Sequence, residues 1–540
     1  MSIIVGDRLG DLSGRQRGGN QILDNLASGP KTDVFGDVSG TLRDQSRGGN
    51  DRITEDQSGS RLFGDGYAMT GSTIGGNDTL LALSFNQELY GDAMTMSGSA
   101  KGGQDVLTVS SLYENLVVGD AASMTCNTVG GKDKLFLLGN KYEDPLTLNT
   151  LYGDAITMAG HARGGDDNFA YSGFGNANFY GDAKTIAGNA QGGKDTITLS
   201  TFGQGIGFGD ADIISGHGRG GHDTLKISAG EVTGYGDARL MTEWARGGND
   251  KVTISSDNGG PARAYGDADT MSDHTLGGND IITLAFTDNT APILFGDAGT
   301  MTGHALGGHD TFVASEGGQI DVTAYGDAES MSGDTRGGND TFLISGIYGP
   351  ELYGDAGQMG GNARGGKDKF TVTIDTYASV SGDGGALSGQ ARGGDDTITI
   401  ISSTGQGDES GDSGDPSISI LVYGDAITMT GQSSGGKDRL IGGHGNEDFW
   451  GDAGTKAATA IGGKDTFVFG ADSGHDRIHD FQQGKDHIEI SGTVADNIDD
   501  LSITQQLIDG KAASVLHLDA NNEVTVFGAV TLQASDFWFV

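Results

Sequence analysis

The sequence predicts an all-β protein, a parallel β-solenoid of the β-roll or β-helix type, with about fifteen or sixteen coils of about 28 residues and a small β-rich cap at the C-terminus. Three observations predict this fold. Gly 98 stands against only Pro 6, two glycine-containing signatures alternate along the chain, and apolar side chains recur at fixed distances from them. Glycine without a three-residue period excludes collagen, and 35 % hydrophobic residues exceed what a disordered linker carries.

The repeat contains two signatures, usually an aromatic or aliphatic residue followed by Gly-Asp, and then Gly-Gly-x-Asp. The aspartates that end them are called the first and the second column. After Asp7, the first column consists of Asp37, Asp65, Asp92, Asp120, Asp154, Asp182, Asp210, Asp237, Asp267, Asp297, Asp327, Asp355, Asp383, Asp425 and Asp452. The second column consists of Asp51, Asp78, Asp105, Asp133, Asp167, Asp195, Asp223, Asp250, Asp280, Asp310, Asp340, Asp368, Asp396, Asp438 and Asp465. From Asp65 onward the second aspartate follows the first by 13 residues, whereas the return takes mostly 14 to 17, so one leg of the repeat is constant and the other variable.

The constant leg carries a column of unbranched apolar side chains. Ten of the 12 methionines lie four residues after a first-column aspartate, and Ile186, Ile214 and Leu387 fill the same slot elsewhere. Stacked coils need such side chains to fill a narrow interior. Thr95 and Ser97 alternate with Met96 at period two, which predicts a strand with one buried face.

The variable leg also predicts a strand, because apolar residues follow the second aspartate at alternate positions, as in Thr79–Leu83. It ends on an aromatic residue in most copies, namely Phe35, Phe63, Tyr90, Tyr152, Tyr180, Phe208, Tyr235, Tyr265, Phe295, Tyr325, Tyr353, Tyr423 and Trp450. We expect these rings to stack between coils; the alternative is a surface that stacks on sugars. Each copy is thus predicted to hold two strands and two glycine-rich corners.

The aspartates predict a calcium site at the corners. Coils that stack at a strand spacing of roughly 4.8 Å place like charges side by side in each column, which is repulsive unless cations bridge them. Carboxylates and backbone carbonyls are the hard oxygen ligands that suit Ca²⁺ better than Zn²⁺ or Mg²⁺. The alternative is that Asp and Gly are ordinary turn formers whose carboxylates cap backbone N–H groups. We predict multiple Ca²⁺ ions bound by both columns from Asp37 to Asp465.

One segment resembles a known calcium-binding repeat. Residues 442–450, Gly-Gly-His-Gly-Asn-Glu-Asp-Phe-Trp, are similar to the nonapeptide Gly-Gly-x-Gly-x-Asp-x-apolar-x of the RTX, or hemolysin-type, calcium-binding family, with Glu447 where the ligand aspartate belongs. The other copies depart from that nonapeptide in their Gly-Gly-x-Asp signature and in their long period. The resemblance implies a parallel β-roll with calcium between successive turns, and it implies metal binding at the matching aspartates.

The two ends differ from the central repeats. In the first copy Gln21 replaces the second aspartate, so residues 1–36 are predicted to be a capping repeat, with calcium-binding coils over 37–465. Two variable legs are long, around residues 141–150 and 405–417, and the second is expected to be an acidic surface loop. Residues 466–540, which end in Asp536-Phe-Trp-Phe-Val540, are similar to the post-repeat region and export signal of proteins that leave the cell by type I secretion.

Charge and cysteine content limit the partners and the compartment. Lys+Arg 33 against Asp+Glu 74 give a net charge of −41, which disfavours nucleic acid and anionic membranes and favours multivalent cations. The single cysteine, Cys126, excludes an intramolecular disulfide framework. The first residues lack the pattern of a signal peptide, and no stretch is apolar enough to span a bilayer, so export is expected to use the C-terminal signal.

Three groups of residues were weighed as catalytic or metal sites outside the columns. Residues 431–435, Gly-Gln-Ser-Ser-Gly, match a nucleophile-elbow pattern, but Ser433 occupies a small-residue slot filled elsewhere by alanine. His475, His479 and His487 are interpreted as solvated histidines. Cys126 is interpreted as a tolerated small residue, since other copies carry glycine there. No separate catalytic domain is evident, and we expect no enzyme activity.

The leading functional hypothesis is a secreted, calcium-binding structural or adhesive protein that folds on extracellular Ca²⁺ and acts at the cell surface, in the matrix or in a biofilm. A second hypothesis is recognition of a repetitive surface, either ice or a cell-surface or matrix polysaccharide, by outward hydroxyl pairs. These pairs are Thr95/Ser97, Ser123/Thr125, Thr300/Thr302, Ser330/Ser332 and Thr428/Thr430. A bacteriocin-like role is a further alternative, and a polysaccharide-cleaving enzyme lacks a separate acid cluster.

Overall fold

A computed structural model describes residues 2–26, 31–111, 113–138, 148–256, 259–287, 291–315, 321–374, 376–402, 420–508, 510–528 and 531–540. The chain forms two compact units, Met1–Asp280 and Ile281–Val540, and each is described by itself. Apart from two short 3-10 helices, Ile498–Asp500 and Ala534–Asp536, the elements within the described ranges are β-strands. None of the helices found there is long and apolar enough to cross a membrane.

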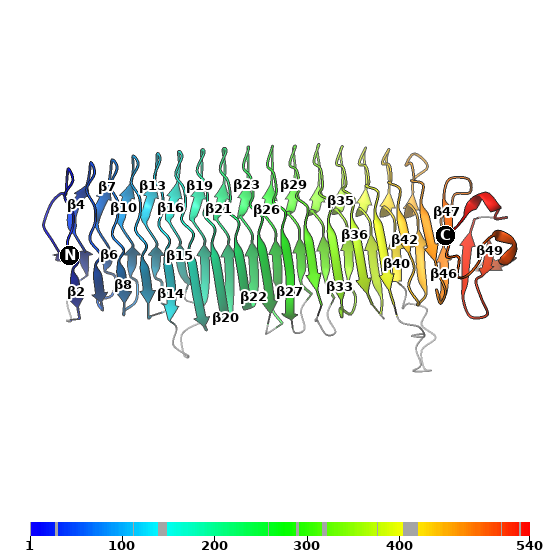
Figure 1. Ribbon diagram of the computed structural model, residues 1–540, viewed down its shortest axis with the longest axis horizontal. Coiled ribbons are helices and arrows are strands. Elements are labelled where there is room, and N and C mark those ends of the chain that lie inside the picture. The colour runs from blue at the N-terminus through cyan, green and yellow to red at the C-terminus, as the bar shows by residue number, and fades with distance from the viewer. Residues whose placement is uncertain are drawn as a thin grey trace. The chain divides into compact units, whose positions relative to one another are not determined.

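Both units are parallel β-solenoids, which confirms the predicted fold class. Each coil contributes a strand to three parallel ladders (Figure 1). The short ladder follows the first-column aspartate, the Gly-Gly ladder follows the second-column aspartate, and the aromatic ladder ends just before the next Gly-Asp. In unit 1 the short strands, such as β19 (Ala183–Ile186), lie in the upper part of Figure 1, and the long strand β20 (Thr196–Phe208) lies in the lower part.

The strands of unit 1 are assigned to these ladders as follows. The short ladder contains β4 (Val38–Leu42), β7 (Gly66–Met69), β10 (Ala93–Met96), β13 (Ala121–Met124), β16 (Ala155–Met158), β19, β21 (Ala211–Ile214), β23 (Ala238–Met241) and β26 (Ala268–Met271). The Gly-Gly ladder contains β2 (Ile22–Asn25), β5 (Arg52–Glu55), β8 (Thr79–Ala82), β11 (Val106–Val109), β14 (Lys134–Leu138), β17 (Asn168–Gly173), β24 (Lys251–Ser256) and the first halves of β20 and β22 (Thr224–Tyr235). The aromatic ladder contains β1 (Ser2–Val5), β3 (Thr32–Phe35), β6 (Arg61–Phe63), β9 (Glu88–Tyr90), β12 (Leu116–Val118), β15 (Leu148–Tyr152), β18 (Asn176–Tyr180), β25 (Ala262–Tyr265) and the second halves of β20 and β22.

Unit 2 repeats the arrangement. Its short ladder contains β29 (Ala298–Met301), β32 (Ala328–Met331), β35 (Ala356–Met359), β38 (Gly384–Leu387), β41 (Ala426–Met429) and β44 (Ala453–Lys456). Its Gly-Gly ladder contains β27 (Ile281–Thr287), β30 (Thr311–Ala314), β33 (Thr341–Ser345), β36 (Lys369–Thr373), β39 (Thr397–Ile401), β42 (Arg439–Ile441), β45 (Thr466–Phe469), β47 (His487–Ile490) and β51 (Phe537–Phe539). Its aromatic ladder contains β28 (Ile293–Phe295), β31 (Thr323–Tyr325), β34 (Glu351–Tyr353), β37 (Ala378–Ser381), β40 (Ile420–Tyr423), β43 (Glu447–Trp450), β46 (His475–Ile478) and β50 (Glu523–Phe527), and β48 (Ser502–Ile508) and β49 (Lys511–His517) join β50 in an antiparallel hairpin arrangement.

The prediction of two strands per copy was wrong, because the variable leg folds back on itself. In the leg that holds β17 and β18, the ring of Phe169 packs against that of Phe179, with centroids 5.6 Å apart. The two halves of this leg therefore face each other and bury apolar side chains between them. A single strand of the same length would leave one end of this apolar run without a partner.

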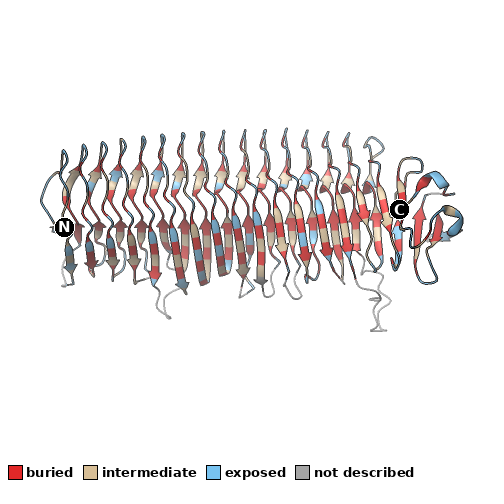
Figure 2. Ribbon diagram, in the orientation of Figure 1, coloured by how far each residue is buried: buried red, intermediate tan, exposed pale blue. Residues whose placement is uncertain are grey.

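The methionine column lies in the interior, as predicted. Met69, Met96 and Met124 are in register on successive short strands and are buried. Buried residues recur from coil to coil along the ribbon (Figure 2). Thr95 is exposed between half-buried Met94 and buried Met96, but β10 ends at Met96, so Ser97 lies just beyond the strand that we expected to include it.

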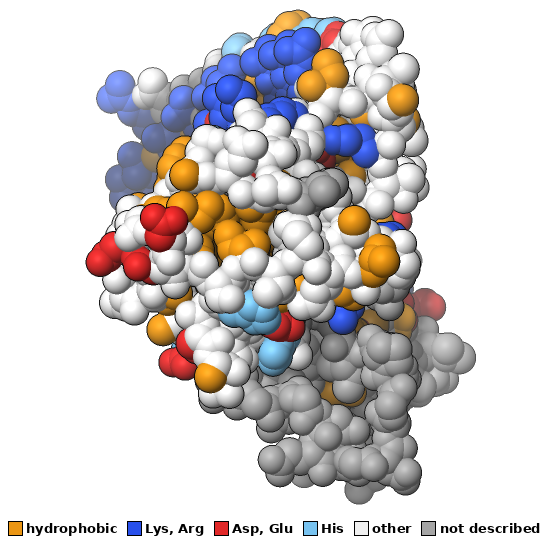
Figure 3. Space-filling model, turned by 90° about the vertical axis from the view of Figure 1, so that its right-hand side faces the viewer, with side chains coloured by type: hydrophobic (Ala, Val, Ile, Leu, Met, Phe, Trp, Pro, Cys, Tyr) orange, Lys and Arg blue, Asp and Glu red, His pale blue; other side chains and the backbone are white. Residues whose placement is uncertain are grey.

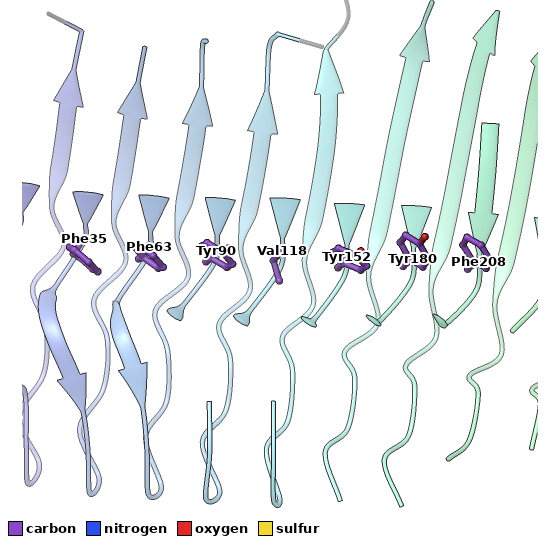
Figure 4. Close-up of a cluster of buried hydrophobic side chains, with 7 residues drawn as sticks. All are labelled: Phe35, Phe63, Tyr90, Val118, Tyr152, Tyr180 and Phe208. Atoms are coloured by element: carbon purple, nitrogen blue, oxygen red, sulfur yellow. The ribbon is translucent and has the colours of Figure 1, made fainter. Parts of the chain in front are cut away.

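The aromatic column stacks between coils, as predicted. In unit 1 Phe35 stacks on Phe63 at 4.8 Å, and Tyr180 stacks on Phe208 at 4.6 Å (Figure 4). In unit 2 Tyr423 stacks on Trp450 at 4.7 Å. Phe63 and the other column members in this unit 1 cluster are at most 8 % exposed, so these ring faces do not form a surface that stacks on sugars.

Both long variable legs fall largely outside the described residues. Residues 139–147 of the first leg and residues 403–419 of the second lie outside the described ranges, and so does the expected acidic loop at 405–417. Beyond Asp465 the parallel ladders continue through β45, β46 and β47. The predicted boundaries at residues 36 and 465, and the export signal, stay predictions.

Candidate metal centre

The two aspartate columns, which the sequence places at glycine-rich corners, lie inside the coils. Every member from Asp37 to Asp465 is at most 2 % exposed. The outer turn lies elsewhere, at positions such as Gly98, which adopts a φ of 76°. The two signatures instead face each other across the coil, so that the Gly49 N–H group donates a hydrogen bond to Asp37 at 2.8 Å.

First-column carboxylates accept hydrogen bonds from the backbone of the opposite leg. The donor is the N–H group of the second glycine in Gly-Gly-x-Asp of the same coil, as in Gly131 to Asp120 at 3.0 Å and Gly221 to Asp210 at 2.7 Å. Each first-column side chain is thereby held across the coil interior, toward the second signature.

Second-column carboxylates connect neighbouring coils. The Oδ1 atom of Asp105 accepts a hydrogen bond from the N–H group of Asp78 in the preceding coil at 2.6 Å, and Asp195 accepts one from Asp167 at 2.6 Å. The Oδ2 atoms are buried without a hydrogen-bond partner in Asp51, Asp78, Asp105, Asp133, Asp167, Asp195, Asp223, Asp340, Asp368, Asp396, Asp438 and Asp465. The prediction that these carboxylates cap N–H groups is therefore correct for one oxygen, but it leaves the second oxygen unexplained.

Glycine is required because carboxylate and carbonyl oxygens crowd its α-carbon. A Cβ atom on Gly64 would lie 2.1 Å from Asp78 Oδ2 and 1.8 Å from the carbonyl oxygen of Gly91. A Cβ atom on Gly75 would lie 1.6 Å from the Oδ1 atom of Asp92. The glycines thus line a narrow cradle in which both columns and backbone carbonyl oxygens come close together.

Burial makes these carboxyls weak acids. It raises the pKa of Asp51 to about 7 and the pKa values of Asp223 and Asp396 to about 8. Burial, reinforced by the neighbouring Asp65 carboxylate, raises the pKa of Asp37 to about 10. Ionising the columns at neutral pH without a compensating cation is therefore unfavourable.

The donor set fits calcium. It consists of buried carboxylate and carbonyl oxygens, and one Ca²⁺ ion per coil would balance its two column aspartates. Within the described part of the chain, no three His, Cys, Asp or Glu side chains form a group that could hold a metal ion. An ion shared by the columns would therefore be held by aspartate oxygens together with backbone carbonyl oxygens of the glycine turns, and it would supply the missing positive charge.

The chain supplies its own donors where the columns end. The side-chain amide of Gln21, in the second-column slot of the first copy, donates to Asp7. At the other end Lys456 occupies the slot next to Met429 in register, and its ammonium group forms an ion pair with Asp452. An amide at one end and an ammonium at the other thus compensate terminal first-column carboxylates.

Sequence reasoning missed two further acids that extend this arrangement. Asp486 accepts a hydrogen bond from the N–H group of Asp465 at 3.1 Å, as the next second-column aspartate would. Asp480 accepts hydrogen bonds from Gly451, Asp452 and Ala453. The signal for Asp486 was present in residues 483–486, Gln-Gly-Lys-Asp, which form a Gly-Gly-x-Asp signature that lacks its first glycine.

The RTX-like copy forms a separate acid pair. Glu447 is buried and accepts hydrogen bonds from the Gly443 N–H group and the Ser402 hydroxyl, both at 3.1 Å. Its own N–H group donates to Asp476 at 2.9 Å, and the Oδ2 atom of Asp476 is buried without a partner. Asp476, which the sequence analysis did not select, thus accompanies Glu447.

The remaining candidates do not converge on a site. Ser433 is fully buried in the small-residue slot, and Cys126 is exposed at a turn with a φ of 68°. His475 lies near Glu523 and His487 stacks on Trp538. The interpretation of His479 as solvated was wrong, because it stacks on Trp450 at 4.2 Å and lies 2.6 Å from Asp448.

Comparison with known protein families adds one finding. Residues 386–537 match the peptidase M10 serralysin C-terminal family. The serralysin-type match begins in β38, covers the last coils with Asp396, Asp425, Asp438, Asp452 and Asp465, and ends in β51. It spans little more than a quarter of the chain and agrees with the resemblance to calcium-binding RTX repeats. No curated protein and no solved structure matches the chain.

Proposed function

We propose that this chain is a secreted, calcium-binding repeat protein that folds on extracellular Ca²⁺ and serves as a stiff structural or adhesive element at the cell surface, in the matrix or in a biofilm. The observation that carries the proposal is the burial of two aspartates in each coil, together with second-column Oδ2 atoms, such as those of Asp78, Asp105 and Asp195, that lack hydrogen-bond partners. A fold that buries so many carboxylates needs a cation to become stable at neutral pH.

The serralysin C-terminal match supports secretion together with calcium binding, because it covers the last coils and the segment after them. We further propose export by type I secretion machinery. In the calcium-poor cytosol the columns would repel one another, so the chain would stay unfolded and competent for export. It would fold once calcium becomes available outside the cell. No enzyme activity is proposed, because the described candidates Ser433 and Cys126 do not converge with a base.

The proposed role predicts that calcium holds the protein at cells. Producing cells are grown with calcium, divided, and washed with buffer containing either calcium or excess chelator, and the released protein is measured with an antibody. Retention in calcium and release in chelator supports the surface or matrix role. Protein that is free in the medium under both conditions contradicts it, whereas a loss of strand signal in chelator tests the calcium-dependent fold separately.

The hydroxyl surface receives less support from the arrangement of side chains. In unit 1 Thr95, Ser123, Thr157 and Thr185 are in register, but Ile213 and Leu240 continue the same column. A flat array that matches ice would need an uninterrupted column. Thermal hysteresis of the calcium-loaded protein tests this second candidate, and its absence removes ice binding.

A further inference from the structure

An open groove crosses the outer turns of unit 1, and no column aspartate lines it. It has a volume of about 810 Å³ and is lined by Asn127, Val129, His161, Arg163, Asn189, Gln191, His217 and Arg219. These residues come from four successive coils and occupy two positions of the repeat. None of the eight is acidic, although the chain has a net charge of −41.

Backbone hydrogen bonds hold the groove residues in register. The N–H groups of His161, Asn189 and His217 donate to the preceding turn at 2.6, 2.8 and 2.6 Å. Parallel bridges connect Val129 to Arg163, Arg163 to Gln191 and Gln191 to Arg219. Because each coil advances by roughly 4.8 Å, equivalent side chains of the groove recur at that spacing, one set per coil.

One row of the groove alternates between amide and imidazole side chains, and the other carries a guanidinium group on every second coil. One row runs Asn127, His161, Asn189 and His217, and the other runs Val129, Arg163, Gln191 and Arg219. Arg163 and Arg219 lie two coils apart, about 10 Å at the strand spacing, with an amide-bearing coil between them. Both guanidinium groups belong to exposed residues, and within the described residues neither forms an ion pair.

An aromatic residue follows the groove on the next coil. Trp244 is 52 % exposed and lies within 6.2 Å of His217 and 4.0 Å of His274 between ring centroids, with both pairs stacked. Because the two imidazoles cover the two faces of the indole, the exposed part of Trp244 is the edge of its ring. Glu243, with a φ of 64°, precedes Trp244. It places an acidic residue at the outer turn, where the four coils of the groove have none.

We propose that this groove binds an acidic polysaccharide in which charged and neutral sugars alternate. One pyranose unit of an extended chain has about the length of one coil step, so an acid on every second sugar would meet His161 with Arg163 and then His217 with Arg219. Asn189 and Gln191 offer amide donors and acceptors to the hydroxyl groups of the intervening sugar. Trp244 contacts the last sugar of the groove with the exposed edge of its ring.

The spacing favours this ligand over nucleic acid. Phosphates follow one another at 3.4 Å along each strand of B-form DNA, so a charge on every unit would face the neutral coils as well as the basic ones. Figure 3 shows Lys and Arg side chains gathered toward the upper edge of the molecule, and in unit 2 Arg336, Arg364 and Arg392 occupy the same ladder position as Arg163. These consecutive arginines lack the alternation and provide a matched control.

The test uses the full chain in excess calcium and an octasaccharide of alternating glucuronate and N-acetylglucosamine as the probe. Calorimetry is carried out on the wild type, on a variant with Arg163→Gln and Arg219→Gln, and on a variant with Arg336→Gln and Arg364→Gln. We expect about tenfold weaker binding in the groove variant and unchanged binding in the control variant. Trp244→Ala is expected to weaken binding and to abolish any change in tryptophan fluorescence on addition of the probe.

Three outcomes would overturn the proposal. The first is wild-type affinity in the groove variant, and the second is an equal loss in both double variants, which would indicate unspecific attraction along the arginine ladder. The third is tighter binding of a single-stranded DNA oligonucleotide of the same net charge than of the octasaccharide. A neutral oligosaccharide of equal length should not bind measurably, and circular dichroism in calcium verifies that each variant is folded.

Discussion

The ammonium group of Lys456 forms an ion pair with the buried carboxylate of Asp452 at the end of the first column. Lys456 occupies the strand position that Met429 holds in the preceding coil. A positively charged side chain therefore ends a column of apolar side chains. The side chain of Lys456 is 26 % exposed and that of Asp452 is not exposed. This pair indicates that a buried column carboxylate in this fold is tolerated when a positive charge accompanies it.

Replacing Lys456 by methionine is expected to lower the free energy of unfolding of the calcium-loaded protein by about 1–3 kcal/mol, because Asp452 then loses the cation that this chain supplies. Urea unfolding followed by circular dichroism measures the loss. The control is Lys464→Met, which removes an exposed lysine of the neighbouring signature. Equal unfolding midpoints for Lys456→Met and the wild type would argue against charge compensation at the end of the column.

A comparison of two adjacent aspartates separates column charge from surface charge. Asp167 is buried with an unpartnered Oδ2 atom, whereas Asp166 is exposed and pairs with Lys132. Asp167→Asn is expected to raise the pH at which the calcium-free chain loses its strand signal, since it removes a buried charge, and to lower the number of calcium ions that the folded chain binds. Asp166→Asn should leave the number of bound calcium ions unchanged and should change the free energy of unfolding by no more than about 0.5 kcal/mol. Equal effects of the two substitutions on calcium binding would contradict the assignment of the second column.

The calcium-free chain is expected to be most stable in acid. Because burial raises the folded-state pKa values of Asp51, Asp223, Asp396 and Asp37 to about 7, 8, 8 and 10, the folded state binds more protons than the unfolded state. The stability that these protonated carboxyls contribute is fully present below about pH 4, the pKa of an aspartate in the unfolded chain. It is lost as the pH rises through the pKa values of the folded state. Urea midpoints in calcium-stripped buffers from acidic to alkaline pH measure this slope.

Saturating calcium should remove or reverse that slope, because bound calcium requires ionised carboxylates. Calcium binding near neutral pH is likewise expected to release protons, which a pH-stat detects in weakly buffered solution. A calcium-free chain that becomes more stable with rising pH would contradict the assigned burial of the columns.

The glycine cradle predicts a strong dependence on position. Gly102→Ala would place a Cβ atom 1.5 Å from the Oδ1 atom of Asp120, whereas Gly98→Ala meets backbone atoms of Gly71 only at 2.9 Å. We expect Gly102→Ala to cost at least about 3 kcal/mol and Gly98→Ala about 1–2 kcal/mol, the latter mostly from its positive φ. Thermal unfolding in calcium measures both. A smaller cost for Gly102→Ala would show that the cradle is wider than the structure indicates.

Much of the fold can be predicted from the sequence, because equivalent residues of the repeat lie at constant distances from the two aspartates. The constant offset of Met96 and its equivalents predicts an interior column, and the aromatic position before Gly-Asp predicts stacked rings. The third ladder does not follow, since nothing in residues 168–180 distinguishes one long strand from two strands that face each other. The fold-back depends on packing between Phe169 and Phe179.

The residues of the candidate site were predicted, but their burial inside the coil was not. The spacing identifies the aspartates, yet their burial depends on which glycines form the outer turn. Gly98 has a positive φ and lies at that turn, while Gly102 lies in the interior beside Asp120. Asp486 was missed because its signature had lost a glycine, and the basic groove was missed because it appears only when turns from four coils lie side by side.

The calcium content of the folded chain tests the central claim most directly. Protein equilibrated with calcium and freed of unbound ion by gel filtration is analysed for metal by mass spectrometry, with circular dichroism recorded before and after excess chelator. The two columns predict about one ion for each second-column aspartate, about fifteen per chain, and a loss of the strand signal in chelator. One or two ions per chain with an unchanged strand signal would show that protons, and not calcium, neutralise the buried aspartates.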